Sequence, residues 1–191
     1  QESEHVWSAK QRIAVFLSAM RHFAENLRAK HWPLTYTALD APDNPGTLGA
    51  VLMADIARLR PTALVMTAPG DWRVLQAIRA VAVAAALPLD LRDDRHFFTT
   101  VRDFAAHIKG RKQLRLEYWY RELRHKTGIL MDGDQPEGGQ WNFDADNRES
   151  FGKAGPQNVP PPTRFAPDAI TLEVIALVNT QFASHPGTLS T

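Results

Sequence analysis

The sequence contains no cysteine among its 191 residues. This absence excludes disulfide bonds, thiolate zinc sites, cysteine nucleophiles and cysteine-ligated iron–sulfur clusters within the chain. An excess of one charge is also lacking, because 22 Lys and Arg residues stand against 21 Asp and Glu residues. A basic coat over the whole surface is therefore excluded, although a local basic patch is not.

Membrane and nucleotide signatures are missing as well. No apolar run reaches the roughly 18–20 residues of a membrane span, and no signal-peptide pattern opens the chain. There is no G-x-G-x-x-G motif, no P-loop and no G-x-S-x-G motif. We therefore predict no catalytic residue, and we expect a cytoplasmic protein without membrane contact. Metal binding is not predicted either, because no histidine pair stands beside a suitable carboxylate at ligand spacing; the histidines considered are His22, His31, His96, His107 and His125.

Apolar residues recur at helical spacing in four segments, at residues 13–27, 48–59, 75–85 and 170–178. Three short runs rich in strand-forming residues lie at 34–39, 63–67 and 87–91. The second run is continuously apolar, as in a strand buried on both faces, and Pro88 places the third at a sheet edge. This order predicts an α/β fold, a Rossmann-like parallel sheet with flanking helices. Three strands are few for such helices, so we expect the first strands to be missing from this chain, as in a piece of a longer protein.

The composition changes after residue 100. Residues 101–126 carry eight Lys or Arg against three acids, with Tyr118, Trp119 and Tyr120 in the middle. This basic helix could stack on a nucleic acid, or form a solvated cationic face whose aromatics pack inward. Residues 131–150 carry six acids against one arginine. Their spacing does not fit an EF-hand, and it favours an irregular loop clamped by Trp141 and Phe143. We predict an α/β domain at 1–100, incomplete at its N-terminus, and a helical and loop extension at 101–151.

Two long strings make the sequence recognisable. They are GRKQLRLEYWYRE at residues 110–122 and KTGILMDGDQPEGGQWNFDADNR at residues 126–148. Shorter matches are LSAMRHFA at 17–24, PGDWRVL at 69–75 and RFAPDAIT at 164–171. Together, and in order over essentially the whole chain, they resemble the amino-terminal half of the deoxyribodipyrimidine photolyase-related proteins. These are the iron–sulfur bacterial cryptochromes and (6-4) photolyases.

The resemblance implies a parent enzyme, a DNA photolyase-like lyase, that repairs pyrimidine photoproducts under blue light. In this family a helical carboxyl-terminal domain holds FAD and a four-cysteine iron–sulfur cluster and binds damaged DNA, while the α/β domain holds an antenna pigment. That antenna is 6,7-dimethyl-8-ribityllumazine in several members. By this resemblance the chain starts after the first two family strands and stops before the part of the helical domain that holds FAD. Residues 152–191 are then a proline-rich linker and the start of that domain.

Alone, such a chain is expected to be catalytically silent, and its parent is expected to be a monomer. Two alternatives stay open. One is a cryptochrome-type photoreceptor with the same cofactors and no repair. The other is a stand-alone module that binds a small molecule or a nucleic acid.

The resemblance also suggests cofactor-binding residues for the antenna. A family glutamate that contacts the lumazine falls on Glu2, although Ser8 and Ala9 stand where the family often has paired histidines. Phe16 could line the same pocket, or belong to the core. Further candidates, which would face the crevice at the carboxyl ends of the strands, are Gly70, Asp71 and Trp72. The alternative for Asp71 is the start of a helix, and for Glu2 a frayed terminus.

Overall fold

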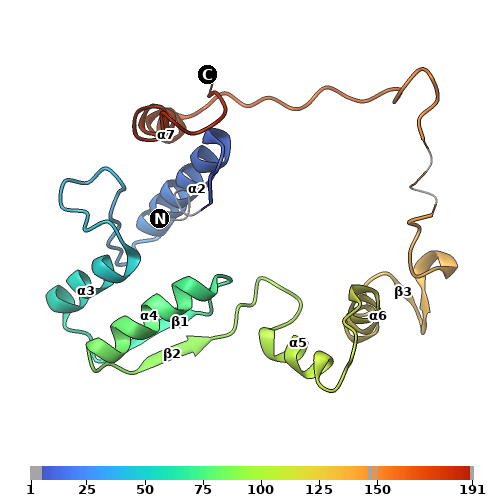
Figure 1. Cartoon of the computed structure of the whole chain (residues 1–191), viewed down its shortest axis with the longest axis horizontal. Helices are drawn as coiled ribbons and strands as arrows, with labels where there is room; N and C mark the ends of the chain where they lie inside the picture. Colours follow the sequence, from blue (N-terminus) through green and yellow to red (C-terminus); the bar gives the residue numbers. More distant parts are fainter. Residues whose placement is uncertain (1–5, 146–147, 149, 190–191) are drawn as a thin grey trace. The chain divides into compact units, whose positions relative to one another are not determined.

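The computed structural model describes residues 6–145, 148 and 150–189 (Figure 1). In chain order its elements are α2 (Lys10–Ala29), α3 (Leu48–Leu59), β1 (Leu64–Thr67), α4 (Trp72–Ala84), β2 (Leu89–Arg92), α5 (Val101–Ile108), α6 (Leu116–Thr127), β3 (Met131–Asp132), β4 (Gln135–Pro136), the 3-10 turn η1 (Glu137–Gly139) and α7 (Ala169–Gln181). The chain forms two compact units, which are described separately below. The first comprises the described residues of Gln1–Thr62, Gln76–Ala86 and Pro162–Thr191, and the second those of Ala63–Leu75 and Leu87–Pro161.

Helices α2 and α7, far apart in sequence, make the core of the first unit. Ile13 and Ala14 of α2 pack with Val174 and Val178 of α7, and both valines are fully buried. The helix expected from the apolar stripe at residues 13–27 is therefore confirmed, but this stripe is only partly covered. Phe16 on the same helix is 58% exposed, whereas Ile13 and Ala14 are buried against α7.

Polar contacts hold α2 against the start of α7. The Arg21 guanidinium lies 3.3 Å from both Asp40 and Glu173. His22 Nε2 lies 2.6 Å from Asp168 Oδ2, and its Nδ1 lies 2.8 Å from the Ser18 carbonyl oxygen. Both ring nitrogens thus face oxygen acceptors, and only the protonated imidazolium can donate to both.

The same contacts shift two pKa values in opposite directions. Hydrogen bonds to the Asp168 carboxylate and then to the Ser18 carbonyl raise the pKa of His22. The pKa of Asp168 falls to about 2, first because of His22 and then because of Thr171. Asp168 also caps α7, since its Oδ1 accepts from the Thr171 backbone N–H at 2.8 Å. One carboxylate therefore both starts α7 and binds it to α2.

The second unit contains a small parallel sheet. Strand β1 pairs with β2 in register from Leu64 opposite Leu89 to Thr67 opposite Arg92, and α4 lies between them in the chain. The α/β class is thus confirmed, with helices flanking a parallel pair along the sequence. The first of the three predicted strands, at 34–39, is wrong, because the described residues between α2 and α3 form no strand. Asn44 Nδ2 donates to the carbonyls of Ala38 and Leu39 at 3.0 and 3.3 Å, so these acceptors are taken by a side chain instead of a strand.

Two further expectations need correction. Strand β1 is not buried on both faces, because Val65 is 55% exposed in a strand whose burial alternates; two strands offer too little neighbouring surface. The predicted basic helix over 101–126 is broken into α5 and α6. Gly110, with φ of +76°, turns the chain between them. The proline-rich residues 152–167 contain no helix or strand, and the division at residues 100 and 151 stays a prediction.

The contact between His22 and Asp168 leads to a pH-dependent prediction. Its stabilisation should be complete above pH 3.8 and below pH 6.5, the unperturbed pKa values of the two groups. It should be lost as the pH rises through the raised pKa of His22, or falls through about 2, the pKa of Asp168. A double-mutant cycle of His22→Gln and Asp168→Asn, read from urea unfolding, should give more coupling at about pH 5.5 than at about pH 8.5.

Asparagine also caps helices well, so Asp168→Asn removes the charge and keeps the start of α7. A coupling free energy that is equal at the two pH values would contradict the imidazolium contact.

Candidate functional site

The residues predicted to bind an antenna pigment fall on separate parts of the chain. Glu2 lies outside the described residues. Phe16 is solvent-exposed on α2 and carries the Arg12 guanidinium carbon 5.6 Å from its ring centroid, so it is not a core residue. Phe16 belongs to the first compact unit, whereas Gly70, Asp71 and Trp72 belong to the second. The structure therefore brings together only the last three.

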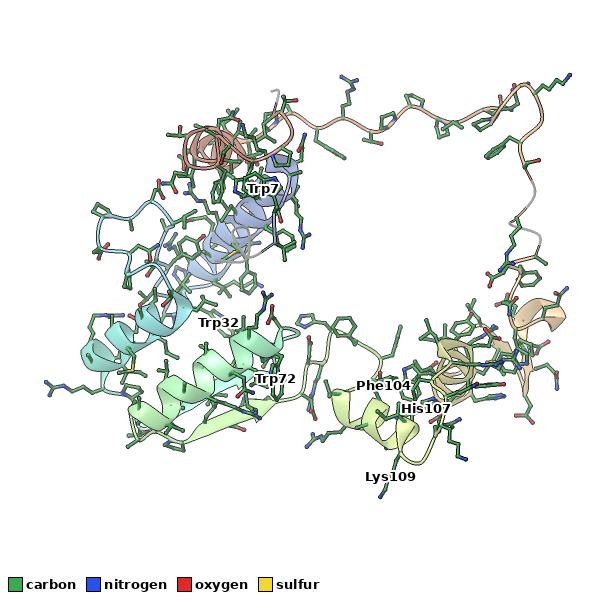
Figure 2. All side chains as sticks on the ribbon, in the orientation of Figure 1. Trp7, Trp32, Trp72, Phe104, His107 and Lys109 are labelled. Carbon is green, nitrogen blue, oxygen red and sulfur yellow. The ribbon has the colours of Figure 1, made fainter. Side chains whose placement is uncertain are left out.

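Gly70, Asp71 and Trp72 form the turn that follows β1. Asp71 Oδ1 accepts from the Arg73 backbone N–H at 2.7 Å, and the Asp71 carboxylate pairs with the Arg73 guanidinium at 2.5 Å. Asp71 is thus placed to cap α4, which begins at Trp72. The Trp72 side chain is 68% exposed at this helix start (Figure 2). The turn therefore exposes the Trp72 ring to a ligand, whereas the Asp71 carboxylate is already bonded to Arg73.

A second arrangement surrounds a buried arginine on α6. Arg124 is only 6% exposed. Its guanidinium donates to the carbonyls of Leu130 and Trp141, and it lies 5.3 Å from the ring centroids of both Tyr120 and Trp141. Within the described ranges no carboxylate lies within 4 Å of it. Carbonyl dipoles and aromatic faces thus offset part of the cost of burying this charge, although its Nε is buried without a hydrogen-bond partner among the described residues.

Trp141 is the centre of this arrangement. The Arg121 guanidinium carbon lies 5.2 Å from its ring centroid, and Arg121 also pairs with Glu117 at 2.7 Å. That ion pair, followed by a hydrogen bond from Asn142, lowers the pKa of Glu117. An open cavity of about 680 Å³ adjoins these groups. Its lining comprises Glu117, Tyr120, Arg124, Leu130, Glu137, Gly138, Trp141, Asn142, Phe143 and Asp144.

The irregular loop expected to be clamped by Trp141 and Phe143 is found only in part, because the two rings do make contacts but the segment is not irregular throughout. A Cβ added to Gly138 would come within 3.1 Å of Phe143 Cζ, so that ring lies directly on the turn. The acidic segment is more regular than expected, because β3 and β4 pair antiparallel within it. Sequence reasoning missed Arg124. Its spacing of four residues from Tyr120 on α6 is the one local signal for it.

A third cluster joins α5 to the opposite face of α6. His107 is buried, its Nδ1 lies 2.5 Å from Glu122 Oε2, and its ring centroid lies 4.6 Å from that of Trp119. Lys126 Nζ bonds Asp103 at 3.1 Å, and the pKa of Asp103 falls to about 2, chiefly through its bonds with Thr100. These contacts fix α5 on α6. Sequence reasoning placed no function on His107.

Two features are absent from the described residues, a metal-binding cluster and a membrane-spanning helix. Among residues 6–145, 148 and 150–189, no three His, Cys, Asp or Glu side chains gather as a group able to hold a metal ion. Within the same ranges, no helix combines the length and the apolar character needed to cross a membrane.

Comparison with known proteins gives two matches. The family model described as deoxyribodipyrimidine photo-lyase-related protein matches residues 1–191. A (6-4) photolyase of Agrobacterium fabrum (strain C58 / ATCC 33970) is 43% identical over 189 residues, which are 98% of this chain. The chain spans 37% of the length of that relative.

The buried position of Arg124 predicts that lysine cannot replace it. Arg124→Lys should lower the free energy of unfolding by about 1–3 kcal/mol, because an ammonium cannot bond both carbonyls and lie across both rings. The matched control is Arg121→Lys, a partly exposed position on the same helix, which should cost less than about 1 kcal/mol. Urea unfolding followed by circular dichroism measures both. Equal costs would show that burial of the Arg124 guanidinium does not matter.

Proposed function

Because the chain belongs to the deoxyribodipyrimidine photolyase-related protein family, we propose that it is part of a light-driven flavoprotein that repairs pyrimidine photoproducts in DNA. The observation that carries this proposal is the family match over residues 1–191, with a (6-4) photolyase 43% identical over 189 residues. The repair chemistry is assigned to FAD in a carboxyl-terminal region outside these residues. An iron–sulfur cluster held by cysteines would also lie there, because this chain has no cysteine.

The part assigned to this chain is to hold the antenna pigment, proposed as 6,7-dimethyl-8-ribityllumazine. Ligands of open parallel sheets bind beyond the carboxyl ends of the strands, and Gly70, Asp71 and Trp72 follow the end of β1. The exposed Trp72 ring offers a face for a flat heterocycle. Asp71 would act by fixing the helix start beneath Trp72, since Arg73 already occupies its carboxylate.

We also propose Phe16 and Glu2 as cofactor-binding residues, on the resemblance alone and apart from the turn at residues 70–72. The Phe16 ring on α2 is exposed and therefore accessible to a ligand. Glu2 would accept hydrogen bonds from ribityl hydroxyls or the heterocycle. A cytoplasmic location and a monomeric state complete the proposal.

Pigment binding is the first test, read by fluorescence titration of the 191-residue chain with the lumazine. Trp72→Ala should weaken binding about tenfold, the loss expected for one stacked aromatic contact. The matched control is Trp32→Ala, which removes another exposed tryptophan and should leave the affinity unchanged. Equal effects of the two variants would remove Trp72 from the site.

Repair is the second test, and it needs a longer protein that contains this chain. Photoreduced protein given duplex DNA with a (6-4) lesion should restore the pyrimidines under blue light, measured by chromatography of the digested DNA. A protein that shows flavin and cluster absorption but leaves the lesion intact would instead be a photoreceptor. A protein without a flavin band would contradict both readings.

A further inference from the structure

The loop between α5 and α6 concentrates positive charge. Helix α5 ends at Ile108 and α6 begins at Leu116. The seven residues between them include four cations and no acid, although the whole chain is nearly neutral. These cations, all exposed, are Lys109, Arg111, Lys112 and Arg115.

Little of this charge is neutralised by the protein. Among the described residues, Arg111 alone of the four has a carboxylate within 4 Å, at 3.8 Å from Glu122. Arg115 stands at the N-cap of α6, where its side chain makes no capping hydrogen bond. The helix dipole disfavours a cation at that end. Folding stability therefore does not explain the composition of the loop, which instead suits an anionic partner.

Contacts between the two flanking helices preorganise the loop. His107, labelled in Figure 2, comes from α5. Its Nδ1 lies 2.5 Å from Glu122, and Lys126 lies 3.1 Å from Asp103, so α5 and α6 are tied together. Arg111 Nε also donates to the His107 carbonyl at 2.6 Å. Anchoring of this kind lowers the entropic cost of ordering the cations around a ligand.

The loop also adjoins a hollow with polar walls. A cavity of about 380 Å³ lies between α5 and α6, and its lining includes Lys109, Arg111 and Lys126. Asp103 and Glu122 line it too, but each already bonds a cation or His107. The acidic segment 131–150 contacts the other face of α6, through Glu117 and Arg124. Successive residues of a helix are about 100° apart, so Glu117 and Arg124 lie on the opposite side of α6 from Glu122 and Lys126. The acidic segment and the hollow beside the basic loop are therefore on different faces of α6.

We propose that residues 109–115 bind the phosphate backbone of duplex DNA, so that this chain itself contacts the nucleic acid. The choice of DNA among polyanions rests on the proposed function. Backbone binding needs no lesion, pigment or light, because cations that neutralise phosphates release counterions from any sequence. The loop would hold DNA without reading its bases.

The test uses the 191-residue chain in the dark with undamaged, fluorescently labelled duplex DNA, followed by anisotropy. With three to four phosphate contacts, the logarithm of affinity should fall against the logarithm of salt with a slope of about −3. Raising salt fourfold, from about 50 to about 200 mM, should then weaken binding roughly 60-fold. The double variant Lys112→Gln/Arg115→Gln should make the slope shallower by about 2.

The matched control is Lys153→Gln/Arg164→Gln, which removes two exposed cations from the proline-rich segment. It changes net charge equally and should leave the slope unchanged. Circular dichroism confirms that each variant is folded. An equal loss of slope in both variants, or no binding at low salt, would overturn the proposal.

A polyglutamate probe that binds as tightly as DNA would also overturn it, because the loop would then suit an acidic protein segment. The test is independent of the proposed function. Failure of lesion repair would leave the dark salt slope unaltered, and failure of dark binding would leave repair intact.

Discussion

A guanidinium keeps its charge at any ordinary pH, so burying Arg124 obliges its surroundings to supply acceptors and aromatic faces. Those groups come from Tyr120 on the same helix and from the segment after α6, where Leu130 and Trp141 contribute carbonyls. Gly128 makes the sharp change of direction possible, with φ of +71° at the end of α6. This one buried charge therefore fixes the acidic segment against α6 and determines what each face of that helix can do.

The opposite face of α6 is left to α5. Trp119, Glu122 and Lys126 follow one another at helical spacing, and all three line the hollow between the two helices. His107 enters this face from α5 and places its ring against Trp119. The cations between the helices are thus anchored from two sides, while the acidic segment 131–150 contacts the other face of α6. The basic residues 109–115 and the acidic segment 131–150 thus occupy different places around α6.

Periodicity in the sequence was enough to place α2, α3, α4 and α7, because each repeats apolar residues over two or more turns. It failed at residues 34–39, where strand-forming residues are present but a side-chain amide takes the carbonyls. Strand propensity is a property of single residues, and it does not say whether a neighbouring strand is present to pair with them. It failed again at 101–126, where composition suggested one helix and Gly110 interrupts it.

The roles of individual site residues were harder to predict from the sequence than the family. The long motifs were sufficient to identify the family, because such strings extend over the whole chain. The roles of individual residues depend on contacts that no local pattern contains. His107 meets Glu122 across 15 positions, and Arg124 meets Trp141 across 17. Asp71 was predictable in its modest role, since capping depends only on its immediate neighbours.

Two of the histidine–carboxylate pairs, His22–Asp168 and His107–Glu122, act as structural ties between helices. His22 has an acceptor at each ring nitrogen, so it has no nitrogen left to take a proton from a substrate. His107 is enclosed by Phe104 and Trp119 and joins two helices through Glu122. Exposed aromatic residues and unpaired cations are, by contrast, the groups available to a ligand. The use of these pairs for support, together with the exposed rings and charge, fits the two proposed roles of this chain, which are to hold a pigment and to contact a polyanion.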